Sequence, residues 1–99
     1  MLFMVISTPR AEPTSEARKG QQRFWAWYNA LVQAGMAKAN YVKTGRGAFI
    51  VLDVDSHETL HRLINEWAEN VPSSFEVYPL VSKEHQERIA ASAAESLQR

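Results

Sequence analysis

Two histidines and a glutamate stand at a spacing that can hold a metal ion. The segment His57-Glu58-Thr59-Leu60-His61 matches the H-E-x-x-H pattern, in which two imidazoles on one helix face bind zinc and the glutamate is a general base. Two observations weigh against zinc. His57 falls in the first turn of its predicted helix, and neither His85 nor Glu76 is placed to be a third ligand. We therefore predict no metal site, with His57 on the helix surface.

His61 has a second possible role, because histidine is the side chain that ordinarily titrates near neutral pH. It lies on the flank of the apolar face that Leu60, Ile64 and Trp67 form on the same predicted helix. From that position it can either line a pocket or pack against the core. His61 is therefore our first candidate for a residue that transfers a proton.

The first predicted helix carries an unusually wide band of apolar side chains. On a helical wheel they spread over roughly 160°, whereas a core-facing helix needs a stripe of only about 100°. The band consists of Phe24, Trp25, Trp27, Tyr28, Leu31 and Val32. We expect the surplus, Trp25 on one flank and Trp27 on the other, to line a pocket or an interface; the alternative is that these rings only fill the core.

Composition limits the functions that remain. A chain of 99 residues forms one domain, and its 11 basic and 11 acidic residues give no basic surface for nucleic acid or an anionic membrane. The lack of cysteine excludes disulfides, thiolate zinc sites and cysteine nucleophiles. No stretch approaches the 18 or so apolar residues of a membrane span. We predict a cytoplasmic protein that acts without nucleic acid or membrane.

The apolar pattern predicts six alternating elements and a tail. In chain order they are a strand over Met1–Thr8, a helix capped by Thr14 or Ser15 and ending near Ala34 before Gly35, strands over Met36–Thr44 and Ala48–Val54, a helix from an Asp55/Glu58 capping box to about Glu69, a strand over Phe75–Val81 and a helical tail over Ser82–Arg99. Gly45-Arg46-Gly47 is a predicted hairpin turn, in which Arg46 is more easily explained as a solvated arginine than as an anion clamp. Pro79 fits an edge strand.

This order predicts an α+β, ferredoxin-like βαββαβ sandwich, with an antiparallel sheet and both helices on one face. Residues 1–81 form the domain, and residues 82–99 form a C-terminal helical tail. In the strand over Ala48–Val54, Phe49 and Val51 point to one face and the alternate apolar residues point to the other. Because helices can cover only one face, we expect the second to pair with another copy of the chain.

Several segments resemble muconolactone isomerase. They are Met1-Leu2-Phe3, the run Gly47–Val54, the residues Ser56, Glu58, Leu60 and His61, and the closing Glu76-Val77-Tyr78-Pro79-Leu80. The resemblance covers the first eighty residues. It implies a dimeric α+β barrel that assembles further into a decamer, and an enzyme that moves a double bond in a small unsaturated lactone by proton transfer, without metal or organic cofactor.

The second strand departs from the isomerase pattern Trp-Arg-His-Leu-Trp-Arg. The matching stretch, Ala37–Val42, keeps a basic residue as Lys38 and an aromatic one as Tyr41, whereas the histidine is replaced by Ala39. The resemblance then implies His61 as proton relay and Lys38 or Tyr41 as oxyanion partner. Shape and substrate contacts are expected from Trp25, Trp27, Tyr28 and Asn40.

We therefore predict an isomerase-like, cofactor-free homodimer or higher oligomer that acts on a small, largely apolar cyclic compound. Two alternatives stay open. The first is a noncatalytic dimer that binds a hydrophobic ligand. The second is a cofactor-free monooxygenase of the same barrel type, in which Trp25, Tyr28 and Asn40 hold a phenolic substrate.

Overall fold

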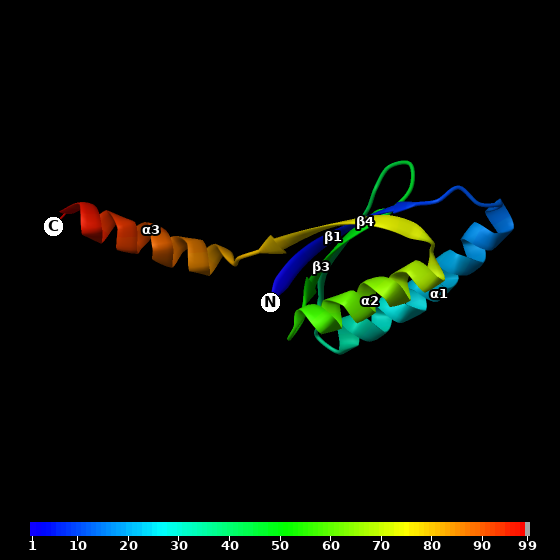
Figure 1. Ribbon diagram of the computed structural model, residues 1–99, viewed down its shortest axis with the longest axis horizontal. Coiled ribbons are helices and arrows are strands. Elements are labelled where there is room, and N and C mark those ends of the chain that lie inside the picture. Colours follow the sequence, from blue (N-terminus) through cyan, green and yellow to red (C-terminus); the bar gives the residue numbers. More distant parts are fainter. Residues whose placement is uncertain (99) are drawn as a thin grey trace.

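The computed structural model describes residues 1–98, and Arg99 at the end of the predicted tail lies outside them. Its element order is the predicted one, with a third helix after the sixth element (Figure 1). The elements are β1 (Leu2–Pro9), α1 (Thr14–Gln33), β2 (Ala37–Val42), β3 (Ala48–Asp53), α2 (His57–Asn70), β4 (Ser73–Leu80) and α3 (Lys83–Gln98).

The four strands form one antiparallel sheet in the order β2-β3-β1-β4. The helices α1 and α2 lie side by side on one face of this sheet (Figure 1). The predicted α+β, ferredoxin-like class is therefore confirmed. β4 is an edge strand, as Pro79 indicated, and it begins at Ser73, two residues before the predicted start.

The core lies between the helices and the sheet, and alternate strand residues point into it. β1 contributes Phe3, Val5 and Ser7, and β3 contributes Ala48, Ile50 and Leu52. The helices cover these residues with Phe24, Leu31, Leu60, Leu63 and Trp67.

The other sheet face, which we call the open face, is also apolar. Its central residues are Leu2, Met4 and Ile6 of β1 and Val51 and Phe49 of β3; Met4 pairs with Val51, Ile6 with Phe49, and Leu2 with Asp53. These five side chains are only partly buried, so the prediction that β1 is buried on both faces is not met within one chain. Neither α1 nor α2 covers this face (Figure 1).

The ends of α1 differ in how well they were predicted. Its N-cap is Pro13, which forms no side-chain capping bond, so the prediction of a Thr14 or Ser15 cap was wrong. Proline fits here because its fixed φ matches the observed −56°, and its carbonyl oxygen accepts a hydrogen bond from the Ala17 N–H at 3.0 Å. At the other end, the predicted Gly35 has φ 77°, and its N–H donates to the Val32 carbonyl oxygen at 3.0 Å. This is a Schellman ending, which favours glycine.

The N-terminus of α2 corrects a second predicted cap. Ser56, and not Asp55, is the N-cap, and its Oγ accepts a hydrogen bond from the Thr59 N–H at 3.1 Å. Asp55 instead accepts a hydrogen bond from the Thr59 hydroxyl. This bond is the main reason that the pKa of Asp55 lies below its usual range. The predicted capping box between Asp55 and Glu58 is therefore replaced by a serine cap.

α3 extends away from the rest of the molecule, beyond the end of β4 (Figure 1). Its first turn is capped by Ser82, whose Oγ accepts a hydrogen bond from the His85 N–H at 3.0 Å. The apolar side chains Ile89 and Leu97 are exposed, Leu97 to 89%. Within residues 1–98 no helix is long and apolar enough to cross a membrane.

Candidate functional site

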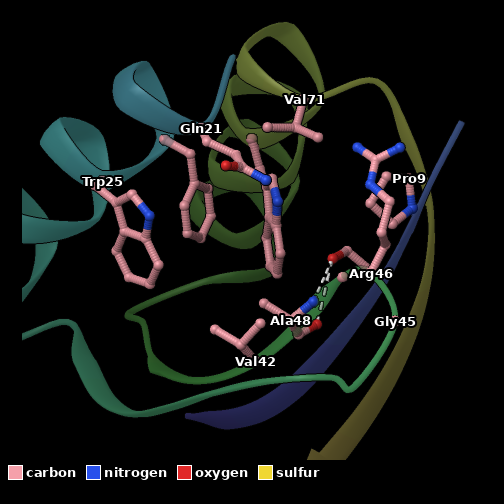
Figure 2. A pocket seen from close by; sticks show the side chains of 12 residues that line it. Pro9, Gln21, Trp25, Val42, Gly45, Arg46, Ala48 and Val71 are labelled. Atoms are coloured by element: carbon pink, nitrogen blue, oxygen red, sulfur yellow. Dashed lines mark hydrogen bonds between the residues drawn. The ribbon is translucent and has the colours of Figure 1, made fainter. Parts of the chain in front are cut away.

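A cavity of about 220 Å³ opens between the two helices and the end of the sheet where the β2–β3 hairpin turns (Figure 2). For comparison, a cavity of about 150 Å³ is sufficient to bind benzene. We call this space the hairpin cavity. It is lined by Ser7, Pro9, Gln21, Phe24, Trp25, Val42, Gly45, Arg46, Gly47, Ala48, Trp67 and Val71.

Aromatic rings from both helices form one wall of the hairpin cavity. Phe24 is buried at the centre of this group, with its ring centroid 5.1 Å from Trp25 and 5.4 Å from Trp67. Trp67 is almost fully buried, whereas Trp25 is 40% exposed. Val42 and Ala48 of the sheet lie opposite the helices (Figure 2). The wall therefore suits a planar apolar ligand.

Ser7 is a buried polar residue at the floor of the hairpin cavity, with only 2% of its surface exposed. Its Oγ accepts a hydrogen bond from the Ala48 N–H at 3.0 Å and donates one to the Ala48 carbonyl oxygen at 3.3 Å (Figure 2). Both bonds stay within the protein, as expected for a buried hydroxyl. Ser7 thus ties β1 to the start of β3 beneath the cavity.

The hairpin turn forms the side of the hairpin cavity farthest from Trp25, and Arg46 extends there beside Pro9 (Figure 2). Gly47 has φ 108°, and a Cβ atom at that position would collide with the backbone oxygen of Ser7. A glycine is therefore needed for the turn to approach β1. Arg46 donates one hydrogen bond, from Nη1 to the Arg10 carbonyl oxygen at 3.4 Å.

Three of the predicted ligand-binding residues lie together on α1, but only Trp25 lines the hairpin cavity. Trp27 packs against Trp67 and donates its indole N–H to Glu66 Oε1 at 2.8 Å. Tyr28 is half-buried; its ring stacks on Phe24 and meets the edge of Trp25. Burial raises the pKa of the Tyr28 phenol, so this phenol keeps its proton to a higher pH than an exposed tyrosine does.

Asn40, the fourth predicted ligand contact, lies near the hairpin cavity without lining it. It sits on β2 opposite Ile50, on the helix-facing side, two residues before Val42 of the lining. Its Oδ1 atom is buried and has no hydrogen-bond partner among the described residues. A buried acceptor of this kind is uncommon.

The three predicted catalytic residues are not brought together, and none of them lines the cavity. His61 is exposed on α2, and Lys38 is exposed at an irregularity of β2. Tyr41 lies on the open face, where it is 66% exposed and stacks on Phe49 with ring centroids 5.4 Å apart. Their catalytic roles stay predictions.

The hairpin cavity also includes residues that sequence reasoning did not select, namely Ser7, Gln21, Arg46 and Trp67. Arg46 is exposed in the turn, as predicted for a solvated arginine, and it also lines the cavity. The signal that could have pointed to it is the pair of glycines on either side, because a Gly-Arg-Gly turn can fold closely onto the sheet. Nothing in the local pattern singles out Gln21.

The H-E-x-x-H segment begins α2, with His57 exposed and its ring 5.7 Å from that of Phe3. Within the part of the chain that the structure describes, no group of three His, Cys, Asp or Glu side chains could hold a metal ion. A second hollow, at the opposite end of the sheet near Gly35 and Asp55, is more polar and more open to solvent. None of the predicted site residues lines it.

Two solved structures share this fold. One is 5-chloro-2-hydroxyhydroquinone dehydrochlorinase from Burkholderia phenoliruptrix AC1100, in complex with 2,5-dihydroxybenzoquinone; the match has a TM-score of 0.66 and 15% identity, and covers 86% of this chain and 98% of that one. The other is muconolactone isomerase, with a TM-score of 0.61 and 22% identity over 83% of this chain and 90% of that one.

The resemblance to muconolactone isomerase in sequence is thus matched by a similarity of fold. No curated protein matches the chain by sequence. A family model matches residues 1–94, nearly the whole chain, and its description is "Domain of unknown function (DUF3303)". The chain therefore belongs to the DUF3303 family.

Proposed function

We propose that the protein binds a small, planar, largely apolar cyclic compound in the hairpin cavity. The observation that carries the proposal is the wall formed by Phe24, Trp25 and Trp67 along one side of this cavity. Planar compounds gain most from such a wall, because aromatic contacts add about 0.5–1.5 kcal/mol beyond the burial of area. The volume of about 220 Å³ fits a single substituted ring.

We infer that the binding unit is a homodimer, in which two open faces pack together. A contiguous apolar surface on a sheet is commonly an interface. The open face has Met4, Ile6 and Val51 at its centre, and Tyr41 and Phe49 extend it toward β2. The hairpin cavity lies on the helix side of the sheet, so pairing of the open faces leaves its lining residues in place.

Catalysis of an isomerase type, by proton transfer, is a second candidate function. Tyr28 favours it, because its protonated phenol, packed against Phe24 and Trp25, can donate a hydrogen bond to negative charge that develops on a substrate. The two enzymes of similar fold are named for reactions of small cyclic compounds. Binding is the better supported function, since the only charged side chain that lines the cavity, in the chain as described, is that of Arg46.

Titration of the full chain with phenol, followed by ligand-observed NMR, tests the binding proposal. Cyclohexanol serves as the non-planar probe of similar size. We expect saturable binding of phenol, weaker binding of cyclohexanol, and a loss of about 3- to 10-fold in phenol affinity for Trp25→Ala, which removes part of the aromatic wall.

The matched control is Val32→Ala, which shortens an exposed apolar residue on the same helix and should leave phenol affinity unchanged. Equal affinity of the native protein and Trp25→Ala for phenol would contradict the proposed site. Absence of saturable binding by either probe would contradict the proposed function itself.

A further inference from the structure

We infer that the cyclic ligand of the hairpin cavity is an anion, and that Arg46 binds its carboxylate. This inference rests on the proposed function, because it adds a charge to the planar ligand that the aromatic wall would hold. It assigns to the hairpin arginine a binding role that its place in a turn did not indicate.

The position of Arg46 is fixed by the backbone on both sides of it. Gly45 and Gly47 have φ of 98° and 108°, and Gly47 is pressed against the backbone oxygen of Ser7. The hairpin therefore lies close over the end of β1. Figure 2 shows Arg46 at one side of the hairpin cavity and Trp25 at the other. A ligand that spans the cavity can thus contact a ring at one end and a guanidinium at the other.

The guanidinium of Arg46 retains most of its capacity to donate hydrogen bonds. It has five N–H donors, and the structure gives it one hydrogen bond, at 3.4 Å to the Arg10 carbonyl oxygen. No carboxylate pairs with Arg46 in residues 1–98, and none of the residues that line the cavity is acidic. The charge at the cavity mouth is therefore not neutralised by the protein.

Basic residues lie near the hairpin cavity, whereas Glu66, the acidic neighbour of Trp67 along the chain, is paired with Arg62 at 2.8 Å. Lys43 donates to Thr8 Oγ1 at 3.1 Å and Arg23 donates to the Asn70 carbonyl oxygen at 3.4 Å, so these cations also bond to neutral acceptors. Each basic residue neighbours a lining residue along the chain: Lys43 follows Val42, Arg23 precedes Phe24, and Arg10 follows Pro9. Lys43 also lies against Gly47 in space. Such a cluster raises the local concentration of anions at the opening.

The guanidinium of Arg46 suits an anion that can accept two parallel hydrogen bonds. A guanidinium is planar and binds a carboxylate through two parallel hydrogen bonds, which are stronger than hydrogen bonds between neutral groups. Gln21 and Ser7 are the polar lining residues that carry no charge, and Figure 2 shows Gln21 on the helix side of the cavity. The ligand is therefore a single-ring carboxylate, with its ring toward Trp25 and its carboxylate toward Arg46.

Isothermal titration of the full chain with benzoate and with benzamide, its neutral counterpart of similar shape, tests this assignment. We expect benzoate to bind at least tenfold more tightly than benzamide. Arg46→Gln should lower benzoate affinity about tenfold and leave benzamide affinity unchanged, because only the charged hydrogen bonds are lost. Arg46→Lys should recover part of the benzoate affinity, since it restores the charge without the planar geometry.

Arg88→Gln is the matched control, because Arg88 is an exposed arginine on α3 outside the cavity lining. It should leave both affinities unchanged. Equal binding of benzoate and benzamide to the native protein would overturn the anion assignment while leaving the proposed function in place. If acetate, which has no ring, binds as tightly as benzoate, the aromatic wall contributes nothing to binding, and both the proposed function and this inference are contradicted. If neither ring compound binds saturably, both the proposed function and this inference fail.

Discussion

Tyr28 lies on α1 beside the hairpin cavity, and its burial affects how its phenol titrates. Burial raises the pKa of its phenol, so the folded protein holds the proton more tightly than the unfolded chain does. A raised folded pKa contributes stability that is complete below the unfolded value of about 10 and is lost as the pH rises through the folded value. The burial of this ring should therefore make the folded state lose stability in alkaline solution.

We expect Tyr28→Phe to leave stability at pH 7 nearly unchanged and to reduce the loss of stability between about pH 9 and pH 11. Urea unfolding at the two pH values measures this difference. Tyr78→Phe is the comparison, because its pKa is raised mainly by a hydrogen bond to Glu76 at an exposed position. An alkaline loss equal to that of the native protein would contradict the role of Tyr28 burial.

The same variant separates the two candidate functions. If the Tyr28 hydroxyl stabilises negative charge on a bound ring during proton transfer, Tyr28→Phe should lower the rate of deuterium incorporation from D₂O into that ring while changing affinity little. If the protein only binds its ligand, the native chain should catalyse no such exchange. NMR of the probe compound measures both outcomes.

At the residue scale, the sequence predicted the aromatic wall better than the polar groups. Trp25 stood out because the apolar band of α1 is wider than a core requires, and this width is visible from spacing alone. His61 was chosen for its chemistry, but its position depends on the rotation of α2 about its own axis. Because Leu63 and Trp67 take the buried face, His61 lies in solvent. Arg46 could not be placed without the fold of the hairpin.

At the scale of elements, Gly20 determines how closely α1 approaches the end of α2. A Cβ atom at this position would lie 2.5 Å from the backbone oxygen of Asn70. We expect Gly20→Ala to destabilise the fold by about 1–3 kcal/mol, because the helices would have to move apart. The gain of up to about 1 kcal/mol that alanine usually brings in a helix is smaller than this cost. Thermal and urea unfolding measure the sign of the change.

Asn29→Ala is the control for Gly20→Ala, because Asn29 lies exposed on the same helix. Its replacement should be neutral or slightly stabilising, in line with helix propensity. A Gly20→Ala protein that is more stable than the native one would show that α1 and α2 tolerate a wider separation. It would also remove the close contact as a reason for the glycine.

The elements themselves were predictable because their signals are local in the sequence. Two examples are the alternation of apolar residues in Ala48–Asp53 and the glycine at position 35 that ends α1, and the structure confirms both. The cap of α2 was misassigned because Asp55 and Ser56 are adjacent and both are good N-caps. Only the backbone geometry at Ser56, with φ −157° and ψ 163°, decides between them.

At the scale of the whole molecule, the open face is an apolar surface that the helices α1 and α2 leave uncovered. It joins apolar side chains of β1 and β3, and Tyr41 and Tyr78 extend it onto the two edge strands. In Figure 1 the helices α1 and α2 lie on the opposite face, and α3 extends away from the sheet. A second copy of the chain would bury the open face against an identical surface, as in a closed two-fold dimer. This pairing would also bury β1 on both faces, as its apolar sequence predicts.

A charge at the centre of the open face should prevent this association. Val51 pairs with Met4 in the middle of the sheet and points away from the helices. In a dimer, Val51→Lys would bring two lysines into an apolar interface without partners, and burying an unpaired charge costs several kcal/mol. We expect the native protein to sediment as a dimer and Val51→Lys as a folded monomer. Asn65→Lys, on the exposed side of α2, should remain dimeric. A dimeric Val51→Lys would contradict the pairing of open faces, and so would a native protein that is monomeric at millimolar concentration. In that case a single chain would have to bind the ligand with the residues that line its own hairpin cavity.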